Sequence, residues 1–498
     1  MRLTYCLRRY VSKLELFKHI RNQGNDYGIN DVALKKENSN KTVIVEYSSP
    51  NIAKPFHVGH LRSTILGNFV GNIYERYGWN VVRLNYLGDW GTQFGLLLIG
   101  FKKYGKESEL EKNPLHHLLE VYVKVNSDVE TEKKSGNSYT YNAGIETFNK
   151  LEKGDAELLA LWQKFTDISL KEYTKLYKRL GVTFTEYHSE SMYNEQVTEV
   201  TNKLKQLGLL CYDKEGKGYV KIRNKKGKEE NVSVLKSNGS SLYITRDIAA
   251  ILDRYERYKF DKIHYVVENA QHSHFCHLAG VIEQIPGWEN RLNEDIHIKF
   301  GRISGISTRK GNVIFLKDFI EEAEDRVRAS ILAKQSTKVD NTDLDDTVRE
   351  LGRSSILTQD LGQRRLKNYK FTWERIIYST KLQYCHARLC SIERSSNLPL
   401  LDVFEEDHLT SNVKANELCE YLTKYESAMQ ESFDNLEPHI IVRYLDELCD
   451  LVNAAYKTCR VKDTEDDIAQ AYLQMFNASK TVLANGMTLI GLSPLDKM

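Results

Sequence analysis

The feature that most constrains the fold is a strand–helix–strand pattern near the start of the chain. Residues 42–47, TVIVEY, are a β-branched run typical of a buried strand. From Leu61 to Tyr77 apolar residues recur four apart, which is one stripe of a helix, and Gly78 can end it. A second strand is expected at 81–86, VVRLNY. This βαβ unit predicts a parallel sheet that is buried on both faces.

The α/β alternation continues and then stops. Further strands are expected at 218–222, 241–244, 263–267 and 296–300, and helices at 155–180, 193–207 and 246–258. Beyond Asn312 strand-like runs disappear and helical stripes take over, such as Ile441, Tyr444, Leu445, Leu448, Leu451 and Val452. The predicted layout is an N-terminal region at 1–40, an α/β domain at 41–335 with a helical insertion at about 97–180, and an all-α bundle at 340–498.

Composition narrows the class of protein. Hydrophobic residues make up 41% and charged residues 28%, as in globular proteins, and the net charge of +2 argues against a generally basic nucleic-acid binder. No apolar run reaches the roughly 18 residues of a membrane span, so no membrane contact is expected. The eight cysteines form no C-x-x-C pair. The first 21 residues hold six basic residues against Glu15, which suits either a mitochondrial import signal or the exposed face of a first helix.

The tetrapeptide His57-Val58-Gly59-His60 stands between the first strand and the first helix. A metal site needs three or four ligands, and no third one lies nearby, so a metal is disfavoured. Taken alone, the two histidines would be turn residues that cap a helix. Free N–H groups at a helix N-terminus favour an anion, Gly59 permits close approach, and Lys54 adds a cation. The pattern therefore favours phosphate binding.

A second candidate for phosphate binding is the loop 305–312, GISTRKGN, which follows a predicted strand. Its glycines, hydroxyls and cations suit it to grip a polyphosphate, although alone it could be a surface turn. Together with the paired histidines it points to nucleotide chemistry.

These motifs resemble those of class I arginyl-tRNA synthetases, most closely the mitochondrial branch. HVGH matches the HIGH signature and ISTRKGN the KMSKS-type loop, and the segments SLYITRDIAAILDRY, LQYCHARL and VLANGMTLIGLSPLDKM also match. The resemblance runs from about Lys41 to Met498. It implies a Rossmann-like HIGH-type nucleotide-binding catalytic domain with a helical insertion, followed by an anticodon-binding bundle. The implied reaction is ATP-dependent activation of L-arginine to arginyl-adenylate and transfer to the 3′-terminal adenosine of tRNA(Arg). Mg²⁺ would enter with ATP, and no structural metal is expected.

The resemblance also implies roles for individual residues. ATP would be bound by His57, Gly59, His60, Ser307 and Lys310. Thr308 stands where the family motif has its second lysine, so Lys54 and Lys310 are the candidate catalytic cations beside the catalytic His57 and His60.

A guanidinium group is a planar fork, best held by a carboxylate. Tyr243 and Asp247 are four apart at an expected strand-to-helix junction, so they could face one pocket, although Asp247 could instead form a surface ion pair with Arg246. By resemblance, the arginine-binding residues are Glu46, Ser49, Pro50, Asn51, His60, Tyr243, Asp247 and Gln271.

For tRNA, a basic cluster suits phosphate contacts or a solvated helix face, and it comprises Arg364, Arg365, Lys367 and Lys370. By resemblance, Tyr384, Tyr456 and Met498 contact anticodon bases. The expected partners are tRNA(Arg), L-arginine and ATP. A monomer in the mitochondrial matrix is expected, with the cytoplasm as the alternative.

Two departures keep other functions open. The family carries an additional N-terminal domain, for which only the residues before Lys41 are available, and the segment 377–382 is shorter than in the family. A catalytically weakened tRNA-binding paralogue is one alternative. Another is a HIGH-type nucleotidyltransferase acting on a small cofactor, which would leave the helical C-terminal part without a purpose.

Overall fold

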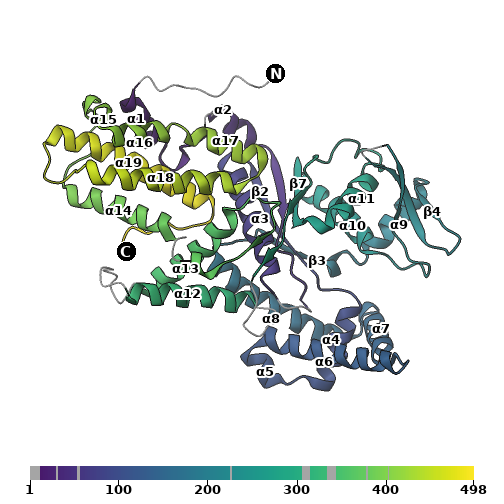
Figure 1. Ribbon diagram of the computed structural model, residues 1–498. Coiled ribbons are helices and arrows are strands. Elements are labelled where there is room, and N and C mark those ends of the chain that lie inside the picture. Colours follow the sequence, from purple (N-terminus) through teal and green to yellow (C-terminus); the bar gives the residue numbers. More distant parts are fainter. Residues whose placement is uncertain are drawn as a thin grey trace.

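The centre of the molecule is a five-stranded parallel sheet with strand order β3-β2-β1-β7-β8 (Figure 1). The computed structural model describes residues 12–29, 32–52, 56–224, 227–305, 315–333, 344–376, 380–401 and 403–498. The strands are β1 (Thr42–Glu46), β2 (Asn80–Leu87), β3 (Glu186–Ser189), β7 (Lys262–Glu268) and β8 (His297–Phe300). Ile44 of β1 pairs with Val82 on one side and Ile263 on the other, so β1 is central and its apolar residues are buried. The predicted parallel sheet is confirmed.

Helix α3 (Gly59–Arg76) connects β1 to β2 and lies against the sheet. The predicted stripe is buried at Leu61, Ile65, Phe69 and Ile73. Gly67 lets the helix approach the strand, because a Cβ at this position would lie 2.1 Å from the Tyr47 side chain.

Two excursions leave the sheet between β2 and β7 and form separate lobes (Figure 1). The first is helical and comprises α4 (Thr92–Tyr104), α5 (Glu107–Lys112), α6 (Pro114–Lys134), α7 (Tyr139–Glu152) and α8 (Ala156–Leu180). The predicted helix at 155–180 is confirmed, since Asp155 caps α8 by accepting a hydrogen bond from the Leu158 amide and Gly181 ends it with φ 68°.

The second excursion carries a small antiparallel sheet between helices. It comprises η2 (Glu190–Tyr193), α9 (Gln196–Gln206), β4 (Leu210–Tyr212), β5 (Gly218–Arg223), β6 (Glu229–Ser233) and α10 (Tyr243–Tyr258), and after β7 come η3 (Asn269–Gln271) and α11 (His272–Ile282). The strand predicted at 241–244 is wrong. Ser241 makes only an isolated bridge to Leu235, and α10 begins at Tyr243. Ile244 belongs to the buried face of that helix, so its β-branched neighbourhood misled the prediction.

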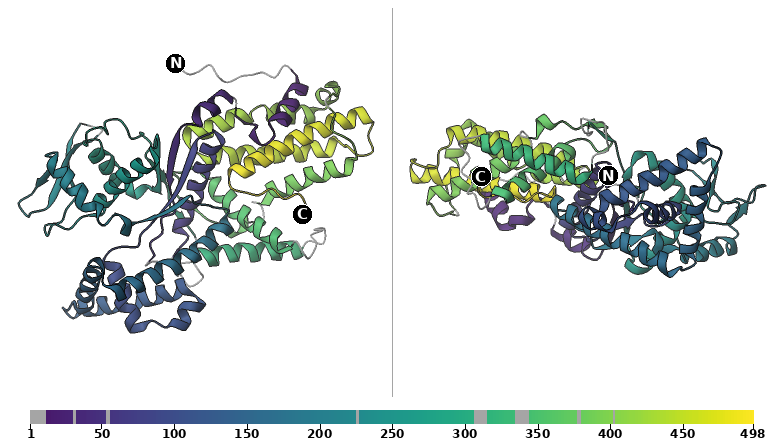
Figure 2. Two further views of the ribbon diagram at one scale, coloured as in Figure 1. Left: turned by 180° about the vertical axis from the view of Figure 1, so that it is seen from behind. Right: turned by 90° about the horizontal axis from the view of Figure 1, so that it is seen from below.

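The C-terminal third is a helical bundle, seen from behind and below in Figure 2. Its elements, with the short segments that lead into it, are β9 (Ile303–Ser304), α12 (Leu316–Ala333), α13 (Leu344–Leu361), β10 (Tyr369–Lys370), η4 (Trp373–Arg375), α14 (Lys381–Ser396), α15 (Asp407–Thr410), α16 (Val413–Leu422), α17 (Tyr425–Asn435), α18 (Pro438–Thr458) and α19 (Asp466–Leu489). The predicted stripe of α18 is buried at Ile441, Leu445, Leu448 and Val452, which confirms an apolar face directed into the bundle.

The N-terminal elements α1 (Lys13–Gln23), η1 (Gly24–Asp26) and α2 (Val32–Asn38) include direct contacts with this bundle. The amides of Lys13 and Leu14 donate to the Glu406 carboxylate, and Asn485 donates to the Gly24 carbonyl at 2.8 Å. Residues 1–11 lie outside the described residues, so the import signal stays a prediction. Among the described residues, no helix combines the length and apolar character that crossing a membrane requires.

A buried ion pair ties α3 to α13. Arg62, two residues after His60, lies 3.3 Å from the Asp360 carboxylate, and both side chains are about 1% exposed. The Arg62 guanidinium also donates to the carbonyls of Gly301 and Lys367. We therefore propose that α12 and α13 form the junction between the α/β part and the bundle.

Candidate active site

The candidate site lies at the topological switch point of the sheet, where the strand order reverses at β1. From β1 the chain passes through α3 to β2 on one side, whereas β7 pairs on the other side of β1. Ligands of open α/β sheets bind at the carboxyl ends of the strands beside such a switch point. The loop 47–52, the start of α3 and the segment after β7 all follow these strand ends.

The loop after β1 has a strained backbone at two consecutive serines. Ser48 has φ 70° and Ser49 φ 43°, a region that non-glycine residues adopt at a cost of roughly 1–3 kcal/mol each. Three contacts hold this conformation. The Ser48 amide donates to Ser63 Oγ at 2.9 Å, its hydroxyl lies 2.8 Å from the Tyr177 hydroxyl, and Gly88 donates to the Pro50 carbonyl. These contacts therefore hold Ser49, Pro50 and Asn51 beside the end of β2, in spite of the strained backbone.

The rings of His57 and His60 lie against one another, with centroids 4.3 Å apart and planes inclined by 36°. The Gly59 amide donates to His57 Nδ1 at 3.0 Å, so the Nε2 of a neutral His57 carries the proton and can donate. The amides of His60 and Leu61 donate to the carbonyls of His57 and Val58. The amides of the first turn of α3 thus already have acceptors, and the expectation that free N–H groups bind the anion is wrong. His60 Nδ1 donates to the His57 carbonyl at 3.3 Å, so of the two neutral imidazoles it is His57 that carries its proton on Nε2.

The structure gives Gly59 a second role beside the expected close approach of a ligand, which stays a prediction. A Cβ at this position would lie 2.5 Å from His57 Cε1, so the absence of a side chain is what allows the His57 ring to fold back over the helix start. The glycine is required by the histidine conformation itself.

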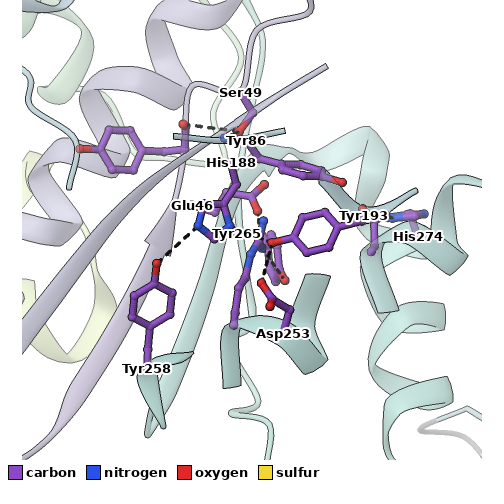
Figure 3. A network of polar contacts seen from close by, with 12 residues as sticks. Glu46, Ser49, Tyr86, His188, Tyr193, Asp253, Tyr258, Tyr265 and His274 are labelled. Atoms are coloured by element: carbon purple, nitrogen blue, oxygen red, sulfur yellow. Dashed lines mark hydrogen bonds and ion pairs between the residues drawn. The ribbon is translucent and has the colours of Figure 1, made fainter. Parts of the chain in front are cut away.

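Glu46, the last residue of β1, is buried and paired. Arg254 of α10 donates from Nη1 to Glu46 Oε2 at 2.6 Å and to the Tyr265 hydroxyl at 3.2 Å. The guanidinium lies over the Tyr86 ring at 5.1 Å. Burial raises the pKa of Glu46 most, and the neighbouring Asp247 carboxylate raises it further. Figure 3 shows Glu46, Tyr86 and Tyr265 close together.

Asp247, one turn into α10, accepts a hydrogen bond from His274 Nε2 at 2.7 Å. This hydrogen bond raises the pKa of His274. The interpretation of Asp247 as the partner of Arg246 in a surface ion pair is therefore wrong. Its carboxylate faces His274 of α11 and lies near Glu46. Two carboxylates thus approach one another at the ends of β1 and α10.

The other residues assigned to arginine binding lie at the edge of this region, on three different segments. Tyr243 begins α10 one turn before Asp247 and is 57% exposed. Gln271 is exposed in η3, directly after β7. Asn51 forms a bridge with Gly88 at the end of β2.

The Tyr86 hydroxyl is a polar group that could still form a hydrogen bond with a ligand. It is buried, and among the described residues no hydrogen-bond partner reaches it. Burial raises the pKa of Tyr86, and the Asp247 carboxylate raises it further, which places the phenol near that carboxylate. A buried hydroxyl without a partner costs free energy unless a ligand or water completes it.

Three residues assigned to nucleotide chemistry, Lys54, Ser307 and Lys310, lie outside the described residues. The described ends of their segments converge, because His57 bridges to Phe315 and the Leu316 amide donates to the Phe56 carbonyl at 2.9 Å. A cavity of about 400 Å³ opens beside Phe56 and Phe315, against α8 and the α5–α6 turn. Its lining mixes acidic and basic side chains, and no residue assigned to arginine lines it.

The basic cluster of 364–370 divides in the structure. Arg364, Lys367 and Lys370 are exposed, and Lys370 lies beside Gly305, where the 305–312 loop begins. Arg365 is different, since it donates to the Lys299 carbonyl and pairs with Glu437.

The bundle presents an aromatic surface between α14 and α18. Tyr456 is 46% exposed, and the Arg388 guanidinium lies over its ring at 5.2 Å. Tyr384 is half-buried one turn before Arg388. Met498 is partly buried against the bundle core.

Comparison with known proteins decides the family. A model described as "tRNA synthetases class I (R), catalytic domain" matches residues 26–373, and one described as "DALR anticodon binding domain" matches 382–498. The chain belongs to the class I arginyl-tRNA synthetases. As a member, it is an aminoacyl-tRNA synthetase, a ligase.

Relatives of this synthetase occur in both compartments. The human protein named "Probable arginine--tRNA ligase, mitochondrial" is 38% identical, over 100% of this chain and 85% of its own length. The *Saccharomyces cerevisiae* protein named "Arginine--tRNA ligase, cytoplasmic" is 37% identical, over 94% of this chain and 80% of its own. The solved arginyl-tRNA synthetase from *Plasmodium falciparum* is 26% identical with a TM-score of 0.79, covering 98% of this chain and 83% of that one.

Sequence reasoning missed three side chains of the candidate site: Tyr86, Arg254 and His274. Arg254 follows Asp247 by seven residues on one helix, so helical spacing could have placed both on one face. No local pattern marks Tyr86 or His274, because they reach the site only through sheet pairing and the packing of α10 against α11.

Proposed function

We propose that this arginine–tRNA ligase serves mitochondrial translation. It uses ATP to convert L-arginine to arginyl-adenylate and transfers the arginyl group to the 3′-terminal adenosine of tRNA(Arg). The observation that carries the specificity for arginine is the approach of the Asp247 and Glu46 carboxylates at the sheet's switch point. Within a class I arginyl catalytic domain, carboxylates at that place suit a guanidinium substrate.

In the proposed complex, Asp247 receives the guanidinium group of the substrate and Tyr243 packs along its side chain. Glu46 acts through its second oxygen, because Arg254 already occupies Oε2. The unpartnered Tyr86 hydroxyl offers a further polar contact. Ser49, Pro50, Asn51, His60 and Gln271 orient the rest of the amino acid.

The chemistry proposed for the first step needs no strong base, since a carboxylate is ionised at neutral pH. The arginine carboxylate attacks the α-phosphorus of ATP and pyrophosphate leaves. His57 donates from Nε2 to the phosphates and His60 contacts the nucleotide, with Gly59 beneath it. Ser307, Lys310 and Lys54 supply further phosphate contacts. Mg²⁺ accompanies ATP. In the second step the 2′-hydroxyl of the terminal adenosine attacks the carbonyl carbon and AMP leaves.

For tRNA we propose two contact areas. Arg364, Lys367 and Lys370 contact backbone phosphates near the catalytic part, whereas Arg365 is left out because it is engaged with Glu437. Tyr384, Tyr456 and Met498 contact anticodon bases, with Arg388 beside Tyr456. A monomer carries all of these residues.

The decisive experiment is arginine-dependent ATP–pyrophosphate exchange by the purified full-length chain, with and without tRNA(Arg). The ligase should show exchange that depends on both arginine and tRNA. A catalytically weakened tRNA-binding paralogue would show none, and a small-cofactor nucleotidyltransferase would show exchange that ignores arginine. Imaging of a tagged full-length chain in cells tests the mitochondrial assignment, and a cytosolic signal would contradict it.

A further inference from the structure

A cluster of potential metal ligands lies in the bundle, outside the proposed active site. His386 and Cys390 are four apart on α14, so their side chains leave the same face of the helix. Asp496, from the C-terminal tail, reaches the same place, and Figure 1 shows the C-terminus near α14. His386 and Cys390 are buried, and Asp496 is exposed. The cluster therefore joins a helix to the end of the chain.

The separations within the cluster suit one metal ion. Cys390 Sγ lies 3.5 Å from Asp496 Oδ1 and 4.0 Å from His386 Nε2, and the three ligand atoms all lie within 4.8 Å of one another. Zinc–ligand bonds of about 2.0–2.3 Å in tetrahedral geometry place ligand atoms about 3.5 Å apart. The cluster needs only small side-chain movements to reach that geometry.

The His386 ring is held as metal-binding histidines are. Its Nδ1 donates to the Leu495 carbonyl at 2.9 Å, which directs the lone pair of a neutral ring to Nε2. The carbonyl comes from the residue before Asp496, so one stretch of tail both orients the histidine and supplies a ligand.

Other contacts bring the tail to this position. The Leu495 amide donates to Gln383, and Gln383 donates to the Ser493 carbonyl. Arg394 donates to the Asp496 backbone carbonyl at 2.9 Å, which leaves the carboxylate to Cys390. The nearby Lys480 is paired with Glu393, which offsets its charge.

We propose that His386, Cys390 and Asp496 form a binding site for a thiophilic divalent cation, Zn²⁺, with water as the fourth ligand. Nitrogen, sulfur and carboxylate ligands together match zinc. On binding, the Cys390 thiol proton is released to solvent and the sulfur bonds the metal. The site fixes the C-terminal tail on α14. None of its residues is placed in the arginine or ATP site, although Tyr384 and Met498, proposed to contact tRNA, lie two residues from His386 and Asp496.

The test is titration of the chelator-treated full-length chain with Co²⁺, a spectroscopic substitute for Zn²⁺. The wild type should bind one equivalent with a thiolate-to-cobalt charge-transfer band that Zn²⁺ abolishes. Cys390→Ser should lose the band and bind at least 10-fold more weakly. Cys449→Ser, which alters a buried thiol elsewhere in the bundle, should keep both. No band in the wild type, or an unchanged band in Cys390→Ser, overturns the proposal.

A second measurement uses the exposed ligand, whose replacement leaves the core intact. Zn²⁺ should slow carboxypeptidase release of the last residues at least several-fold in the wild type and have no effect in Asp496→Asn. Equal rates with and without Zn²⁺ in the wild type would show that the tail is not held by metal and overturn the proposal.

Discussion

His274 donates from Nε2 to the Asp247 carboxylate at 2.7 Å, across the contact between α11 and α10. This histidine occupies one oxygen of the carboxylate that we propose for the guanidinium of the substrate. Arginine must therefore share Asp247 with His274 or displace it. The competition makes arginine binding sensitive to the protonation of His274.

The first prediction concerns pH. Hydrogen bonding to Asp247 raises the pKa of His274 above about 6.5, its usual value. Below the raised pKa, His274 is a cation that holds Asp247 strongly, and as pH rises through that pKa the ion pair is lost. As pH rises through the pKa of His274, the KM for arginine in tRNA-dependent exchange should therefore fall. In His274→Asn the fall should disappear, and the same pH dependence in both proteins would contradict the competition.

The raised pKa of His274 also makes the stability of the folded protein depend on pH in a definite direction. A folded-state pKa above the unfolded value means that the contribution of His274 to stability is present below about pH 6.5 and lost as pH rises through the folded pKa. The difference in free energy of unfolding between wild type and His274→Asn should shrink over that interval in urea titrations at several pH values.

The second prediction concerns the carboxylate itself. Asp247→Asn should lower kcat/KM for arginine roughly 100-fold, since a hydrogen-bonded charge contributes about 1.5–3 kcal/mol. The matched control is Glu256→Gln, an exposed carboxylate on the same helix that pairs with Lys259. It should retain activity within about twofold in the same exchange assay. Equal losses in the two variants would remove Asp247 from the arginine site.

The third prediction compares two arginines of α10. Arg254→Met leaves the buried Glu46 unpaired and should lower the free energy of unfolding by about 3–5 kcal/mol. Arg257→Met breaks an exposed pair with Asp253 and should cost less than about 1 kcal/mol. Urea denaturation followed by circular dichroism measures both, and comparable costs would show that the buried pair does not anchor β1 to α10.

The fourth prediction concerns tRNA. Tyr456→Ala should raise the Kd for tRNA(Arg) about 10-fold or more, because stacking on an aromatic ring contributes about 1–3 kcal/mol per base. Tyr212→Ala, which removes an exposed tyrosine on β4, should leave the Kd unchanged. Filter binding at fixed salt measures both, and an unaltered Kd in Tyr456→Ala would exclude it from the RNA surface.

The sequence predicted the fold better than the contacts of the site. A β-branched run marked β1 and helical periodicity marked α3, α8 and α18, and all four are present. The sequence prediction failed at 241–244, where Ile244 and its neighbours locally suit a strand. The buried stripe of Ile244, Ile248 and Ile251 belongs to a helix. Tertiary packing decided between the two structures.

For the site, motifs identified the candidate residues but not their partners. The Arg254 contact with Glu46 spans 208 residues, and the His274 contact with Asp247 spans 27. Such pairs form only when strands and helices from separate segments are assembled. The contact of Gly59 with the His57 ring was missed for a related reason, since the His57 ring conformation is a three-dimensional property.

The most direct test of the central claim is a crystal structure of the chain with L-arginine and a non-hydrolysable ATP analogue. The account predicts the guanidinium group on the Asp247 carboxylate, with His274 shifted or sharing it, and the phosphates beside His57 and His60. Arginine bound elsewhere, with the His274–Asp247 hydrogen bond unchanged and the phosphates away from the two imidazoles, would contradict it.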